Sequence, residues 1–111
     1  MPWELDSDRP IYAQIVDRLK HEIVSGFYPP GSRLPSVRDL AAQASVNPNT
    51  MQKAFTELER TGLIVTRRTS GRTVTEDTAL IEQVRSELAE LQISQFLTRM
   101  QHLGYQKDDR I

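Results

Sequence analysis

The order of segments with different periodicity constrains the fold of this chain more than any single motif does. The first helical pattern runs from about residue 10 to residue 25 and repeats apolar side chains at Ile11, Ile15, Leu19 and Ile23. Pro10 suits a first helical turn, and Gly26 is expected to end the helix. Residues 27–31 contain two prolines and a glycine and therefore favour a rigid turn.

Two shorter helices are predicted next, each from the residues that begin it. Ser36 and Asp39 have the spacing of a capping box, so a short helix should start at Ser36. Asn47 and Pro48 suit the N-cap and the first position of a further helix. Only residues 44–46 connect the two helices, which is typical of a helix-turn-helix.

The third predicted helix should present two chemically different faces. Its apolar stripe is expected to be buried and consists of Met51, Ala54, Phe55 and Leu58. The polar side chains lie on the opposite face or its flank, at Asn49, Gln52, Lys53, Thr56 and Arg60. Gly62 is expected to end this helix.

Two β-rich runs follow, at residues 63–66 and 72–75. The stretch between them begins with two arginines and continues with turn-forming residues, which predicts a β-hairpin with a basic tip. Three helices followed by a small β-hairpin is the order of the winged helix-turn-helix fold. The predicted fold class is therefore mainly α, with this winged helix-turn-helix followed by a helical C-terminal segment.

The C-terminal segment has helical patterning from about residue 77 to residue 102, without Gly or Pro. One apolar stripe holds Ile81, Val84, Leu88 and Leu91, and a second, rotated by more than a quarter turn, holds Ile93, Phe96, Met100 and Leu103. Either a kink near Ser94 or one long helix with partners on two sides explains this rotation. Residues 107–111 are compatible with the start of a further short helix.

The charged residues are distributed unevenly, although the net charge is only −1. Residues 31–75 carry a net charge of +4, while residues 1–30 carry −2 and residues 76–111 carry −3. A basic middle between acidic ends suggests a polyanion as the partner of the middle. Chance clustering on a solvated surface explains the charges equally well when they are taken alone.

Several classes of protein are excluded or disfavoured. The chain has no cysteine, so it has no disulfide, no thiolate zinc site and no cysteine nucleophile. No apolar run is long enough to span a membrane, and residues 1–6 lack the pattern of a signal peptide, so a cytoplasmic protein is expected. His21 and His102 lie in helical segments without a phosphate-binding glycine loop. We therefore expect no enzyme, no cofactor and no metal site.

In a winged helix the third helix enters the DNA major groove with its N-terminal residues at the base edges. This helix offers amide, hydroxyl and ammonium groups for bases and phosphates, at Asn49, Thr50, Gln52 and Lys53. The helix N-termini at Ser36 and Pro48 present backbone N–H groups that attract phosphate. The hairpin suits contact with the DNA backbone or the minor groove, through Arg67, Arg68 and Arg72. Each feature alone is also typical of an ordinary solvated surface, so their combination carries the hypothesis.

The amino-acid sequence of several stretches resembles that of the GntR family of bacterial transcription regulators. These are residues 10–15, Gly26 and residues 28–41, 46–50, 57–59 and 62–64, and the resemblance extends over residues 10–75. The sequence Val-Asn-Pro-Asn-Thr at residues 46–50 and the short C-terminal segment are similar to the YtrA-like subfamily. The resemblance implies a brief helical dimerisation segment in place of a large effector domain.

The resemblance also implies roles for particular residues. Arg38 stands where the family places an arginine that contacts a base or a phosphate, and residues 48–52 stand at the DNA-facing start of the recognition helix. The wing departs from the family pattern of two glycines separated by one residue, because it reads Thr69-Ser70-Gly71. A different turn is therefore expected there, with Ser70 and Gly71 still among the DNA-binding residues.

The sequence thus predicts a sequence-specific transcriptional regulator, more specifically a repressor that binds double-stranded DNA at an inverted-repeat operator as a homodimer. Residues 1–75 are expected to form the winged-helix DNA-binding domain, and residues 76–111 the helical dimerisation segment. The residues expected at the dimer seam are Ile81, Val84, Leu88, Leu91, Phe96, Met100 and Leu103.

Three points stay open from the sequence. The C-terminal segment is alternatively expected to fold back on Ile11, Ile15 and Leu19 of its own chain. The winged helix is alternatively a protein-interaction module without a DNA role. A small-molecule effector, if there is one, is expected at the dimer seam or between the tail and the winged helix, because residues 76–111 are too few to enclose a cavity of about 300 Å³ alone.

Overall fold

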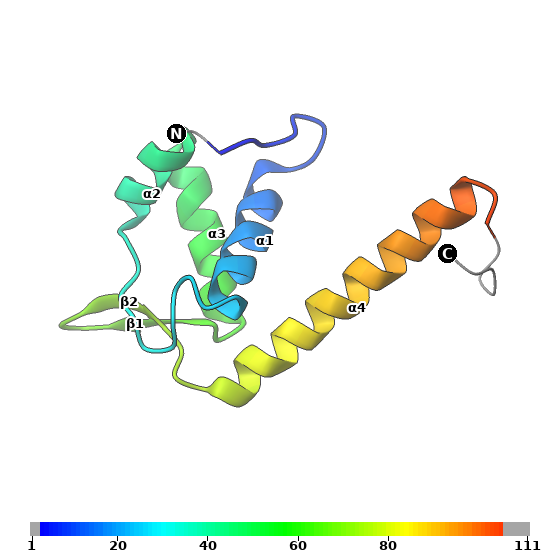
Figure 1. Ribbon diagram of the computed structural model, residues 1–111. Coiled ribbons are helices and arrows are strands. Elements are labelled where there is room, and N and C mark those ends of the chain that lie inside the picture. Colours follow the sequence, from blue (N-terminus) through cyan, green and yellow to red (C-terminus); the bar gives the residue numbers. More distant parts are fainter. Residues whose placement is uncertain (1–2, 106–111) are drawn as a thin grey trace.

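The computed structural model describes residues 3–105. Its elements, in chain order, are α1 (Ile11–Val24), α2 (Val37–Ala44), α3 (Pro48–Arg60), β1 (Ile64–Arg67), β2 (Gly71–Val74) and α4 (Thr78–His102). The first three helices and the hairpin gather into one body, and α4 projects away from it (Figure 1). The predicted winged helix-turn-helix with a helical C-terminal segment is confirmed. The further helix suggested at residues 107–111 lies outside the described residues.

The starts of α2 and α3 follow from local hydrogen bonds, as predicted. The Ser36 hydroxyl accepts a hydrogen bond from the Asp39 backbone N–H at 3.0 Å. The Asn47 side chain accepts one from the Asn49 backbone N–H at 2.8 Å. Each cap satisfies a donor that has no partner inside the helix. The sequence predicted Pro10 in the first turn of α1, but Pro10 precedes the helix as its N-cap.

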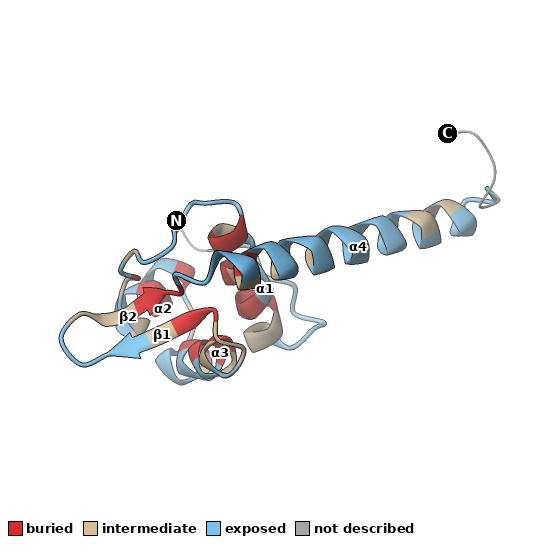
Figure 2. Cartoon of the chain, turned by 90° about the horizontal axis from the view of Figure 1, so that it is seen from below, coloured by how far each residue is buried: buried red, intermediate tan, exposed pale blue. Residues whose placement is uncertain are grey.

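The core lies where the first three helices and the hairpin meet, and buried residues are concentrated there in Figure 2. The predicted stripe on α3 is buried, and so is that on α1 except for Ile11, which is partly buried against the core. Burying one side chain of this size contributes about 1.5–3 kcal/mol relative to leaving it exposed. The largest fully buried side chains are Phe55, Ile15, Leu19, Ile23, Leu40, Met51, Leu58, Leu63 and Val74.

Strands β1 and β2 form the antiparallel hairpin, with Ile64 opposite Val74 and Arg67 opposite Gly71. Gly71 has a φ of +73°, a backbone conformation that side chains other than glycine rarely adopt. The hairpin therefore turns at residues 68–70 and re-enters the ladder at this glycine.

An extended segment that the sequence did not predict pairs with the free edge of β2. The backbone N–H groups of Gly31 and Leu34 donate to the carbonyls of Val74 and Arg72, at 3.0 and 2.9 Å, and the Val74 N–H donates to the Ser32 carbonyl at 2.9 Å. The turn predicted at residues 27–31 is present, because the Ser32 backbone N–H donates to the Pro29 carbonyl at 3.0 Å and Gly31 has a φ of +78°. Residues 31–34 then pair with β2 and tie the loop before α2 to the hairpin.

Helix α4 is continuous and passes Ser94 without interruption, so no kink explains its two apolar stripes (Figure 1). Its first stripe faces the winged helix of the same chain. Ile81 is only 4% exposed and belongs to the core, and Val84 and Leu88 pack partly buried against that core.

The prediction that Ile81 lies at a dimer seam is therefore wrong. The linker after β2 is short, so the first turns of α4 come to lie on α1. The second half of the helix is exposed (Figure 2). Among residues 3–105, no helix is long and apolar enough to cross a bilayer.

Candidate nucleic-acid interface

The start of α3 presents polar side chains on the surface of the molecule. Asn49, Gln52 and Lys53 are exposed, and Thr50 is half-buried. Pro48 occupies the first helical position and is also exposed. The structure thus leaves four of the five predicted residues of this helix exposed, while Thr50 is half-buried and lines a pocket with Trp3 and Ile11.

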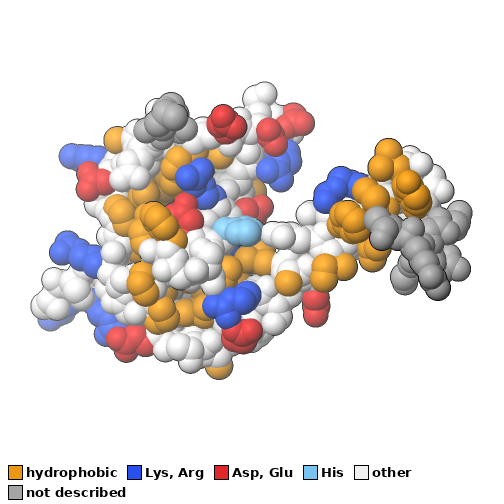
Figure 3. Space-filling view, in the orientation of Figure 1, with side chains coloured by type: hydrophobic (Ala, Val, Ile, Leu, Met, Phe, Trp, Pro, Cys, Tyr) orange, Lys and Arg blue, Asp and Glu red, His pale blue; other side chains and the backbone are white. Residues whose placement is uncertain are grey.

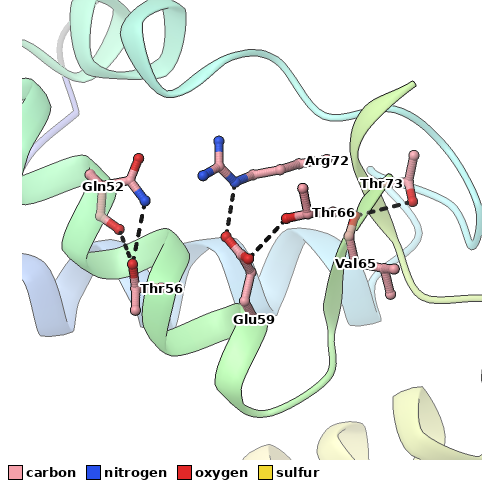
Figure 4. A network of polar contacts seen from close by, with 7 residues as sticks. All are labelled: Gln52, Thr56, Glu59, Val65, Thr66, Arg72 and Thr73. Carbon is pink, nitrogen blue, oxygen red and sulfur yellow. Dashed lines mark hydrogen bonds and ion pairs between the residues drawn. The ribbon is translucent and has the colours of Figure 1, made fainter. Parts of the chain in front are cut away.

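Gln52 is oriented along the surface of α3 by a contact one turn later. Its side-chain N–H donates to the Thr56 hydroxyl at 3.3 Å, and that hydroxyl donates to the Gln52 carbonyl at 3.0 Å (Figure 4). Both groups are exposed. The side-chain amide of Gln52 is therefore held along the helix by one weak hydrogen bond to Thr56. A hydrogen bond to the edge of a base can replace that contact.

Lys53 lies on the flank of α3 that faces α1. Its ammonium nitrogen is 4.1 Å from the centroid of the Tyr12 ring on α1, within the range of a cation–π interaction. The interaction gives this flexible side chain a defined resting position without neutralising its charge.

The arginines of the hairpin differ in their surroundings. Arg67 and Arg68 are exposed at the tip, whereas Arg72 is half-buried and turned toward α3. The Arg72 Nε donates to the Glu59 carboxylate at 2.9 Å, and its guanidinium lies 5.4 Å from the centre of the Phe55 ring. Arg72 was predicted to belong with the basic tip, but the structure pairs it with an acid of the third helix.

Glu59 is a residue of this surface that the sequence analysis did not single out. Its carboxylate accepts hydrogen bonds from Arg72 Nε and from the Thr66 hydroxyl, both at 2.9 Å, and so joins α3 to both strands (Figure 4). Burial acts to raise the pKa of Glu59, but the two hydrogen bonds and the charge of Arg72 outweigh it, so this pKa lies below its usual value. Thr66 and Arg72 are cross-strand partners in the hairpin, so Glu59 contacts one cross-strand pair, which no signal in the local sequence indicated.

A groove of about 510 Å³ separates the start of α2 from the hairpin. Its walls include Ser36 and Asp39 on one side and Gly71 and Arg72 on the other, with Arg33 between them. The sequence counted Arg33 only as part of the basic middle, yet its backbone forms a bridge to Thr73 of β2. The groove therefore brings together predicted residues from two elements that are far apart in the chain.

Two further predicted residues lie on α2 and in the turn of the hairpin. Arg38 is exposed in the first turn of α2, and Ser70 is half-buried in the turn of the hairpin. In the space-filling view, Lys and Arg side chains lie along the edge formed by α2 and the hairpin (Figure 3). Among the described residues, no three His, Cys, Asp or Glu side chains are grouped so that they could hold a metal ion.

The chain has clear relatives among known proteins. The family described as bacterial regulatory proteins, gntR family, matches residues 11–74. The uncharacterized HTH-type transcriptional regulator YhcF of Bacillus subtilis (strain 168) is 35% identical over 108 residues, which cover 97% of this chain and 89% of YhcF. The HTH-type transcriptional repressor YtrA of the same organism is 40% identical over 100 residues, which cover 88% of this chain and 76% of YtrA.

A solved structure shares the same architecture. It is described as a GntR family transcriptional regulator from Listeria monocytogenes and superimposes with a TM-score of 0.84 at 43% sequence identity. The superposition covers 94% of this chain and 91% of that one, so it includes the long C-terminal helix as well as the winged helix.

Proposed function

Because the chain belongs to the GntR family of bacterial transcription regulators and is similar to its short YtrA-like members, we propose that it is a homodimeric repressor of an inverted-repeat operator. Residues 1–75 are the DNA-binding domain, residues 76–111 the dimerisation segment, and the protein acts in the cytoplasm. The family consists of regulators and not of enzymes. The repressor assignment is supported by the relative YtrA, which is named a repressor.

The observation that carries the proposal is the single surface formed by the start of α3, the start of α2 and the hairpin tip. In this proposal Asn49 and Gln52 read base edges in the major groove, because both carry exposed amides. The start of α2, with Ser36 and Arg38, binds backbone phosphate. The exposed tip arginine Arg68, together with Arg67, contacts the adjacent DNA backbone or minor groove.

Dimerisation through the distal half of α4 is supported by its exposed apolar side chains. Leu91 is 53% exposed, Phe96 40% and Leu103 71%. Apolar side chains repeated along one exposed helix favour association with another copy of the same helix. Ile93 and Met100 share the stripe of Phe96 and Leu103, whereas Leu91 lies on the other apolar stripe of the same half of the helix. One winged helix reads few base pairs, so two copies on a palindrome supply the affinity and the specificity.

The proposal is tested by selecting bound duplexes from a random DNA pool with the full chain and sequencing them. We expect an enriched inverted repeat with half-sites about 10 base pairs apart. Binding should weaken steeply as the salt concentration rises, because phosphate contacts release counterions. A folded dimer that enriches no DNA sequence would contradict the proposal and favour a protein-interaction module.

A further inference from the structure

One arginine of α4, Arg85, makes hydrogen bonds to the end of α1. We propose that Arg85 fixes the direction in which α4 leaves the winged helix and thereby selects the half-site spacing that the dimer accepts. This inference rests on the proposed function, because it requires dimerisation through α4 on an inverted repeat. It makes Arg85 a positioning residue that determines specificity without touching DNA.

Arg85 binds the end of α1 through two hydrogen bonds to one acceptor. Its Nε and one terminal nitrogen donate to the Val24 carbonyl at 3.1 and 2.8 Å. The other terminal nitrogen pairs with Glu82, one turn earlier on α4. Val24 is the last residue of α1, where carbonyls lack partners within the helix and carry partial negative charge. The guanidinium therefore caps α1 from the neighbouring helix.

The contact between α4 and the winged helix is otherwise short and mostly apolar. Ile81 is buried, Val84 and Leu88 are half-buried, and the side chain of Gln92 contacts the His21 ring nitrogen at 2.8 Å. These contacts extend over about three helical turns. Beyond them the helix projects from the body (Figures 1 and 2).

The hydrogen bonds of Arg85 restrain the orientation of α4 relative to α1, which the apolar contacts do only weakly. Burial of Ile81, Val84 and Leu88 is largely independent of small rotations of α4, because the hydrophobic effect is not directional. Hydrogen bonds to a single carbonyl weaken steeply once their angles change. The pair of bonds at Val24 therefore resists rolling and tilting of α4 on α1, together with the single exposed contact between Gln92 and His21.

The direction of α4 matters because DNA is helical. Each base pair added between half-sites moves one of them by about 3.4 Å and rotates it by about 35° around the duplex. If the contact between α4 and the winged helix is rigid in each protomer, the two winged helices of a dimer can bind both half-sites at one spacing only. A loosened joint permits several spacings, as a flexible linker does for any bivalent ligand.

Two substitutions separate this role from a general effect on folding. Arg85→Ala removes both hydrogen bonds, and Arg85→Lys keeps the charge but cannot donate twice from a planar guanidinium. Arg85 is exposed and is not part of the apolar core. Arg9→Ala is the charge-matched control, because Arg9 is exposed and lies outside both α4 and the proposed recognition surface.

The experiment keeps the selected half-site constant and varies the spacing one base pair at a time. Affinity is measured for the unaltered protein and the three variants, with melting temperature and sedimentation checked for each. We expect the unaltered protein and Arg9→Ala to lose about 100-fold in affinity when one base pair is added or removed. For Arg85→Ala the loss should be within about tenfold, with Arg85→Lys between, and affinity for an isolated half-site should not change.

The outcomes are distinguishable. A dimeric Arg85→Ala that keeps the full spacing penalty would overturn the inference and leave the proposed function intact. An unaltered protein that is monomeric or selects no inverted repeat would overturn both. If Arg85→Ala fails to fold or to dimerise, Arg85→Lys decides, because unchanged spacing selectivity in that variant also counts against the inference.

Discussion

Two arginines of the hairpin, close in the sequence, have different electrostatic environments. Arg68 is exposed at the tip, whereas Arg72 is paired with Glu59 at 2.9 Å. A charge that is already neutralised by a carboxylate attracts phosphate less than a solvated one does. We therefore expect the electrostatic contribution of the hairpin to DNA binding to come chiefly from its tip.

Replacing Arg68 with alanine tests this expectation. The variant should bind all DNA sequences more weakly by a similar factor, and the slope of log affinity against log salt should fall by about 1. Affinity is measured for the selected operator and for a scrambled duplex over a range of salt concentrations. A changed base preference would show that Arg68 reads sequence and does not only bind phosphate.

Replacing Gln52 with alanine should change the base preference of the protein, in contrast to the uniform loss of affinity expected for Arg68→Ala. The side-chain amide of Gln52 is exposed on α3 and makes only a 3.3 Å contact with Thr56. Its loss should relax discrimination at one base pair by about 1–3 kcal/mol. Repeating the duplex selection with the variant measures this directly. Unchanged preference at every position would remove Gln52 from the set of base-reading residues.

At the scale of elements, Glu59 links the recognition helix to the hairpin. It accepts hydrogen bonds from Thr66 of β1 and Arg72 of β2 while lying near the end of α3. A two-stranded hairpin is marginally stable alone, and residues 31–34 support this one by pairing with the edge of β2. The Glu59 carboxylate adds the link to α3, so it helps to fix how the basic tip is presented relative to that helix.

Comparison with the variant Glu59→Gln should show how much the ionised Glu59 side chain contributes to the pH dependence of the free energy of unfolding. Because the pKa of Glu59 is lowered in the folded chain, its ionised form contributes stability that is complete above the usual glutamate pKa. That contribution is lost as the pH falls through the lowered value. We expect the free energy of unfolding of the unaltered protein to fall more than that of the variant between about pH 6 and pH 3, by at most about 1 kcal/mol.

Denaturant unfolding at a series of pH values measures this difference. Other carboxylates are common to both proteins, so only the difference between the two curves reports on Glu59. Parallel curves would mean that the carboxylate does not stabilise the hairpin.

At the scale of the whole molecule, the distal half of α4 is left uncovered by the other residues within 3–105. Phe96 is 40% exposed on its distal half, and Phe27 is 70% exposed in the loop after α1. Both are large exposed aromatic side chains, but only Phe96 lies on the proposed dimer surface. The two positions therefore form a matched pair for testing dimerisation.

Phe96→Glu should shift the protein to a monomer, because a carboxylate in an apolar seam is costly to bury. Operator affinity should fall by about 100-fold or more once the two half-sites are bound independently. Phe27→Glu should stay dimeric and bind normally. Sedimentation at micromolar concentration and operator titration measure both effects, and a dimeric Phe96→Glu with normal binding would exclude this seam.

Local features of the sequence were sufficient for most of the fold. Side-chain capping at Ser36 and Asn47 involves neighbours two or three residues away, and helical periodicity requires only a short window. The order of the elements then identified the winged helix, and these predictions of the fold are confirmed because the interactions behind the elements are close in the chain. The candidate surface followed from the winged-helix geometry and the polar side chains on it, with Arg38 added by the family resemblance, and its role in DNA binding stays a prediction.

The tertiary structure alone decided the contacts between distant residues. Periodicity marks Ile81 and Leu91 as equally apolar, but Ile81 is buried in its own chain while Leu91 is exposed. Likewise no local signal pairs residues 31–34 with β2, Glu59 with Arg72, or Arg85 with the Val24 carbonyl, 61 residues away. An apolar stripe on a helix predicts that this face will be buried. The surface against which it packs depends on how the other elements are arranged in the tertiary structure.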